Sequence, residues 1–117
     1  GNTVAGRDWI ATFNENREML KWVSENTVEN AVLATDNPPL NYLYTGRKTV
    51  GVSFPERQWE LWKKLGVTHL VRGSNVEIEG ADEEESKFSI PYRSKGKLNL
   101  RVLDLGPKDS RNTWVNR

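Results

Sequence analysis

The spacing of apolar residues changes along the chain, and each change marks a helix or a strand. From Asp8 to about Asn26 the large apolar residues recur with the period of a helix, and Asp8 is suited to its N-cap. Residues 31–34 are apolar throughout and lie between polar neighbours. A run this short is typical of a strand that is buried on both faces. The pattern therefore predicts an amphipathic helix followed by a central strand.

Proline and glycine predict a short helix after this strand. Pro38 and Pro39 fit the first helical positions, where a backbone N–H would have no partner, and Asp36 or Asn37 can cap them. Gly46 can take the left-handed conformation that ends a helix. A second strand is then expected over residues 49–52.

A third helix and a third strand are predicted next. Ser53 and Glu56 have the spacing of a capping box, and Gly66 marks the end of the helix. The residues of this helix that we expect to face the core are Leu61, Trp62 and Leu65. Residues 67–71 form the predicted strand.

Strands that alternate with helices at this spacing predict a parallel sheet with right-handed crossovers. We therefore expect an α/β domain of three layers, αβα, Rossmann-like in outline, with a mostly parallel sheet of four or five strands. The apolar runs should bury Val32 and Leu33 in one strand and Leu70 and Val71 in its neighbour.

The remaining segments break this alternation. We expect residues 1–7 to be a loose lead-in, residues 74–97 to be an excursion over the surface and residues 106–117 to be a polar tail. Residues 98–102 alternate between apolar and polar side chains, which predicts a half-exposed strand at the edge of the sheet. All these segments belong to a single domain, residues 1–117.

Composition excludes several classes of function. The net charge is +1, from 17 basic and 16 acidic residues, so no basic surface for nucleic acid is expected. The chain has no cysteine, which excludes disulfides, thiolate metal sites and cysteine catalysis. No apolar run approaches the roughly 20 residues that cross a bilayer.

Two polar clusters are candidate ligand sites. Asp36 and Asn37 follow the first strand, where ligands of open α/β sheets gather, and either residue can instead simply cap the next helix. Arg47 and Lys48 suit a phosphate, or they satisfy the carbonyl groups of a helix C-terminus.

No catalytic, metal or cofactor site is predicted. His69 is the only histidine and has no acidic neighbour in the sequence, so we expect a structural role for it. The acidic run of residues 82–85 lacks the spaced ligands of a calcium loop and is expected to be solvated. No glycine-rich nucleotide motif occurs.

Residues 9–73 resemble the soluble tail of polytopic, lipid-phosphate-sugar-dependent glycosyltransferases of the protein-mannosyltransferase-like and aminoarabinose-transferase-like group. The resemblance rests on a strand ending near Asp36-Asn37-Pro38, on Leu-Tyr-Thr-Gly-Arg at residues 43–47, and on Leu-Gly-Val-Thr-His-Leu-Val at residues 65–71. It implies a non-catalytic, extracytoplasmic accessory domain that covers the active site or helps to select the acceptor. The implied partners are the membrane-embedded part of its own parent chain and a lipid-linked sugar or acceptor.

Tryptophan supplies a possible docking surface for such a partner. The chain has 5 tryptophans, and this side chain favours sites that are half apolar and half wet. Trp9 and Trp59 are the candidates, and at least one of them should be substantially exposed; core packing is the alternative. Two other functions stay open: a free-standing ligand-binding module with a crevice near Asp36 and Arg72, and an interaction domain without a ligand.

Overall fold

The computed structural model of the chain describes residues 3–51, 58–72 and 87–106. Helix α1, Thr3–Asn26, is longer than the sequence predicted. It passes through Asp8, so Asp8 is not an N-cap, and the residues from Thr3 to Arg7 are helical rather than a loose lead-in. Adding turns to an existing helix costs little compared with starting one, which accounts for the early start.

The strands form one five-stranded sheet in the order β2-β1-β3-β5-β4. They are β1, Val32–Thr35; β2, Lys48–Gly51; β3, His69–Arg72; β4, Ser89–Arg93; and β5, Arg101–Asp104. β1 pairs in parallel with β2 and β3, whereas β5 is antiparallel to β3 and β4. The predicted α/β class is confirmed, with a parallel half and an antiparallel half in the sheet.

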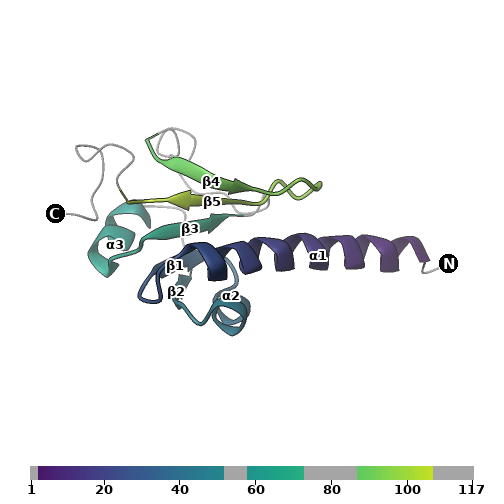
Figure 1. The fold of residues 1–117 in the computed structure, drawn as a ribbon, viewed down its shortest axis with the longest axis horizontal. Helices are drawn as coiled ribbons and strands as arrows, with labels where there is room; N and C mark the ends of the chain where they lie inside the picture. Colours follow the sequence, from purple (N-terminus) through teal and green to yellow (C-terminus); the bar gives the residue numbers. More distant parts are fainter. Residues whose placement is uncertain (1–2, 52–57, 73–86, 107–117) are drawn as a thin grey trace.

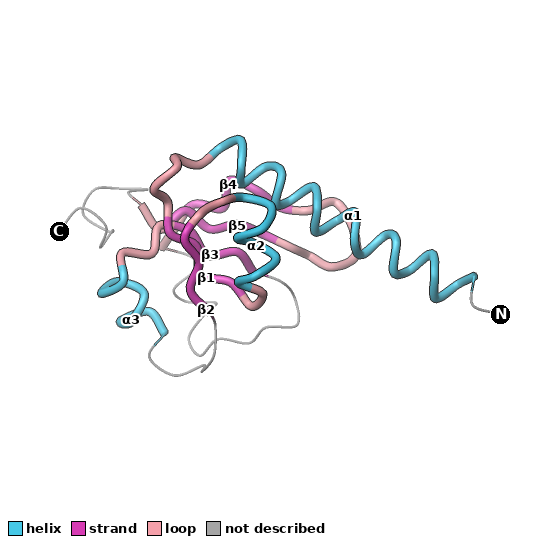
Figure 2. The backbone as a smooth tube through the Cα atoms, turned by 90° about the horizontal axis from the view of Figure 1, so that it is seen from below, coloured by secondary structure: helices cyan, strands magenta, loops and turns pink. Residues whose placement is uncertain are grey.

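Helices lie on both faces of the sheet (Figures 1 and 2). α2, Pro38–Thr45, connects β1 to β2 and shares one face with α1. α3, Gln58–Leu65, lies between β2 and β3 in the chain and covers the other face. The crossover from β1 to β2 and the crossover from β2 to β3 run in opposite directions across the sheet, and right-handed crossovers of opposite direction lie on opposite faces. The strand order therefore reverses between β1 and β3.

Two clusters of buried side chains form the core. On the face of α1 and α2 these are Met19, Leu20, Val23, Leu33, Val71, Leu100 and Val102. On the face of α3 they are Ala34, Trp62, Val67, Leu70, Phe88, Leu103 and Leu105. Among the four predicted core residues, Leu33, Leu70 and Val71 are buried and Val32 is half-buried.

The inward face of α3 was predicted only in part. Trp62 is fully buried, but Leu61 is 50% exposed and Leu65 is 45% exposed, so their predicted core positions are wrong. The helix has only 8 residues, and its contact with the sheet is filled by Trp62 together with the half-buried Trp59. Two indoles leave little room for the leucines.

The order of the last strands also differs from the prediction. β5 is an inner strand between β3 and β4, so the expected edge strand at residues 98–102 is wrong. Asn99 has φ 51, and the apolar alternation around it belongs to the turn that leads into β5. β4 is the edge strand on this side of the sheet, and it lies within the expected surface excursion at residues 74–97.

Candidate functional site

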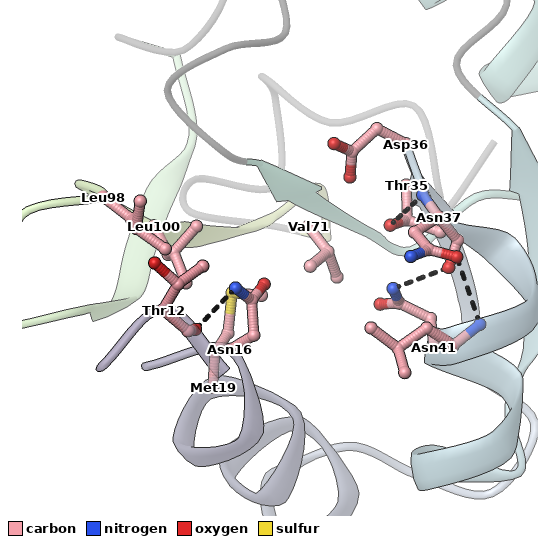
Figure 3. Close-up of a pocket in the computed structure, with 11 residues that line it drawn as sticks. Thr12, Asn16, Met19, Thr35, Asp36, Asn37, Asn41, Val71, Leu98 and Leu100 are labelled. Carbon is pink, nitrogen blue, oxygen red and sulfur yellow. Dashed lines mark hydrogen bonds between the residues drawn. The ribbon is translucent and has the colours of Figure 1, made fainter. Parts of the chain in front are cut away.

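A pocket of about 300 Å³ opens between α1 and α2, above the carboxyl ends of β1 and β3 (Figure 3). This is the point at which the strand order reverses, and it is where open α/β sheets bind ligands. Its apolar lining is aliphatic: Met19, Leu40, Val71, Leu98 and Leu100. Its polar lining is Thr12, Asn16, Thr35, Asp36, Asn37 and Asn41. The volume is at the lower end of the range for small-molecule sites.

Asp36 and Asn37, both predicted as ligand residues, line this pocket. Asn37 is also the N-cap of α2, because its Oδ1 accepts a hydrogen bond from Leu40 N at 3.3 Å. Asn37 can therefore cap α2 through Oδ1 and still offer its Nδ2 group to a ligand, so the two interpretations of this residue are compatible. Asp36 is exposed, and among the described residues it is the only charged one in the lining.

The N-terminus of α2 cannot hold an anion in the usual way. Pro38 and Pro39 have no N–H, and Leu40 N is already bonded to Asn37. The donors that make other helix N-termini attractive to phosphate are therefore absent or occupied here. Together with the carboxylate of Asp36, this makes the pocket unfavourable for negative charge.

Asn41 has a buried oxygen without a partner at the wall of the pocket. The residue is 3% exposed, and its Nδ2 donates to Asn37 O at 3.0 Å. Among the described residues Oδ1 has no hydrogen-bond partner. Turning the amide over would place that oxygen against the carbonyl oxygen of Asn37, so the orientation is fixed. An unsatisfied buried acceptor costs about 1–3 kcal/mol, which a ligand donor can recover.

Arg47 lies away from this pocket. It precedes β2, whose first residue pairs with Val32 at the amino end of β1, whereas the pocket is at the carboxyl end. Its guanidinium donates to Ser24 O at 3.1 Å, to Thr27 O at 2.8 Å and to Thr45 O at 2.7 Å. Arg47 thus joins the C-terminal ends of α1 and α2, as the alternative interpretation of this residue proposed.

Arg72 ends β3 close to Asp36 in the sheet, because Thr35 pairs with Val71. Val71 lines the pocket, and Leu70 belongs to the cluster under α3. Side chains alternate along a strand, so Arg72 lies on the face of α3. The pocket therefore brings together Asp36 and Asn37 but neither of the two predicted arginines.

His69 is half-buried beside Thr68, with Nδ1 2.8 Å from Thr68 Oγ1. Burial lowers the pKa of His69, and the facing carboxylate of Asp104 opposes this effect. The structural role of His69 stays a prediction. Within the described ranges there is no group of three or more His, Cys, Asp or Glu residues that could hold a metal. Residues 82–85 lie outside those ranges.

The structure describes the side chain of only one of the two tryptophans that we predicted as docking residues. The side chain of Trp9 lies outside the described part of the molecule. Trp59 is half-buried and packs edge-on against Trp62, with ring centroids 5.1 Å apart, and stacks on Phe88 at 5.9 Å. The docking role of both residues stays a prediction.

Sequence reasoning missed Thr35, Asn41, Asn16 and Thr12. Asn41 offered a signal, because it follows the capping residue Asn37 by one helical turn and so shares its side of the helix. The α1 residues offered none, since their position over β3 depends on tertiary packing.

Comparisons with protein-family models, with curated proteins and with solved structures found no match. In the described part of the chain no helix is both long enough and apolar enough to span a membrane.

Proposed function

We propose that this chain is a non-catalytic, extracytoplasmic accessory domain of a membrane glycosyltransferase that uses a polyprenyl-phosphate sugar donor. The observation that carries the proposal is the pocket between α1 and α2. Residues of the resembling stretch, from Thr35 to Asn41, supply one wall of it. The domain covers the active site of the parent enzyme or helps to select its acceptor, and the pocket holds part of a reactant.

The part of the lining that the structure describes has no nucleophile–base pair, because Asp36 is the only ionisable side chain there. Catalysis therefore belongs to the membrane-embedded part of the parent chain. Trp9 and Trp59 are the proposed docking residues for that part. The neighbouring α1 residue Ile10 is 53% exposed, which supports a contact surface on this half of the helix.

A sugar-transfer assay tests whether the domain is non-catalytic and whether it helps the parent enzyme to select its acceptor. The chain alone should transfer no sugar from a polyprenyl-phosphate donor, whereas the parent enzyme should lose acceptor selectivity when Asp36→Ala and Asn41→Leu are introduced together. Exposed Asn14→Leu on α1, outside the pocket, is the matched control. Transfer by the isolated chain, lost on changing Asp36, would show that the domain is itself catalytic.

A free-standing small-ligand-binding module is the alternative, and the same pocket supports it. The encoding gene distinguishes the two. Several hydrophobic spans in the same reading frame support the accessory domain, and a start codon directly before Gly1 supports the free-standing module.

A further inference from the structure

The pocket between α1 and α2 has a marked preference among ligand chemistries. Its buried unpaired group is an acceptor, Asn41 Oδ1, and Asp36 adds a carboxylate. Asn16 contributes Oδ1, because its Nδ2 is engaged by Thr12 O at 2.9 Å. A ligand that fills this space must therefore present hydrogen-bond donors.

The same lining also offers donors. The Thr35 hydroxyl accepts from Asn37 N at 3.2 Å, and within the described residues its proton is not used in another bond. The Nδ2 group of Asn37 is likewise not engaged there, since only its Oδ1 caps α2. Groups that both donate and accept match this mixture, and hydroxyl groups are the common ones.

Anions are disfavoured for three separate reasons. Among the described residues the lining contains no lysine or arginine and one carboxylate, and the first two residues of α2 are prolines without N–H groups. A phosphate or carboxylate entering the pocket would lose its water and find few donors. The phosphate of a lipid-linked donor must therefore lie elsewhere.

The size and shape of the pocket narrow the class of ligand further. About 300 Å³ suits a single small ring, and the aliphatic groups of Met19, Val71 and Leu100 can cover its C–H face. Figure 3 shows Met19 and Leu100 on one side of the space, Asn41 across from Met19 and Asn16, and Val71 between the two sides.

We propose that this pocket binds an uncharged polyhydroxyl compound of monosaccharide size, with Asn41 Oδ1 accepting a ligand hydroxyl as the group that determines specificity. The proposal rests on one part of the proposed function, the use of this pocket as a ligand site, and names the class of that ligand. It holds equally for a glycosyltransferase domain and for a free-standing binding module.

The test is an NMR titration of the ¹⁵N-labelled chain with mannose, N-acetylglucosamine, inorganic phosphate and ethylammonium. We expect the neutral sugars to shift the amide signals of Thr35, Asn37 and Asn41, including the side-chain NH₂ of Asn41, with a Kd on the order of 1 mM. Phosphate and ethylammonium should leave them unchanged. Shifts with phosphate or ethylammonium but not with sugars would overturn the ligand class while leaving the pocket as a site.

Asn41→Leu tests the specificity role, because leucine has a similar volume and no acceptor. Affinity for the sugar should fall at least about ten-fold, and Asn14→Leu should bind like the native chain. Thermal unfolding and the dispersion of the NMR spectrum confirm that each variant is folded. If Asn41→Leu does not fold, the titration of the native chain still tests the inference. Chemical-shift changes on adding sugar that are confined to residues away from the pocket would contradict it.

Methyl glycosides identify the source of the ligand. Equal binding of methyl mannoside and mannose indicates a sugar that is linked to a larger molecule, and binding of the reducing sugar alone indicates a free one. Either result supports the polyhydroxyl class. Absence of membrane spans in the parent gene removes the glycosyltransferase proposal and leaves this inference standing.

Discussion

Asn41 lies in α2 and Arg47 lies just after its end, and the two side chains differ in how far the protein itself satisfies their hydrogen bonds. The guanidinium of Arg47 reaches carbonyl groups at the ends of two helices and also donates through Nε to Thr27 Oγ1 at 3.2 Å. The amide of Asn41 is satisfied on its nitrogen side only. A fully paired side chain indicates a structural role, and a half-paired one at a pocket wall indicates a ligand.

Arg47→Ala should therefore destabilise the fold without changing ligand binding. We expect the free energy of unfolding to fall by about 1–3 kcal/mol, because several buried carbonyl groups lose a charged donor. Urea denaturation measures this change. The exposed neighbour Lys48 carries the same charge, and Lys48→Ala should stay within about 0.5 kcal/mol of the native value. Equal losses in the two variants would show that charge, and not the bonds of Arg47, is what matters.

His69 should make stability depend on pH. Its pKa is lowered in the folded chain by burial, so the unfolded chain binds a proton more readily. The stability that depends on a neutral His69 is fully present above a pH of about 6.5. It is lost as the pH falls from there toward the lowered pKa of His69 in the folded state. His69→Asn should show a smaller loss of stability between about pH 7 and pH 5, measured by urea denaturation at each pH. Parallel curves for the two proteins would contradict the lowered pKa.

The contact between α1 and the turn joining β4 to β5 depends on one carboxylate. Glu15 accepts hydrogen bonds from Ser94 Oγ at 2.5 Å and from Leu98 N at 3.1 Å. A Cβ atom on Gly96 would overlap this carboxylate. The glycine therefore serves the close approach of α1 to the turn.

Gly96→Ala and Glu15→Ala should each lower the free energy of unfolding by about 1 kcal/mol, because both changes break the same hydrogen bonds. The double variant should be no less stable than the less stable of the two single variants. This result is expected when both residues take part in the same interaction. A double-mutant cycle by urea denaturation measures this. Strict additivity would mean that Gly96 and Glu15 act independently.

The inner strand β1 is stabilised by its buried side chains. Leu33 is fully buried between the sheet and α1, so Leu33→Ala should cost about 2–5 kcal/mol through lost burial and a residual cavity. The control is Leu43→Ala on α2, where the side chain is 75% exposed. An unchanged unfolding midpoint in Leu33→Ala would contradict the position of β1 as an inner strand of the sheet.

For the molecule as a whole, the sequence predicted the features that are set locally. The N-cap Asn37 and the left-handed Gly46 and Gly66, with φ 67 and φ 72, depend only on their own backbone. The buried runs of β1 and β3 are recognisable because strands covered on both faces have few polar residues.

The missed features are set by tertiary contacts. The pairing of β5 with β3 joins residues that are far apart in the chain, and β4 contains Pro91, which weakens its strand pattern but is tolerated at an edge. The pocket has the same origin, because its walls come from α1, α2, β3 and the residues before β5. Of the pocket residues, the sequence analysis identified only Asp36 and Asn37, through their position after the first strand.

The most direct measurement is a crystal structure of the chain grown with a neutral monosaccharide. The account predicts the sugar between α1 and α2, with one hydroxyl oxygen within about 3.2 Å of Asn41 Oδ1. The hydrocarbon face of the ring should lie on Met19 and Val71. A sugar bound only at another surface, or a pocket in which Asn41 Oδ1 bonds to a donor of the protein itself, would contradict it.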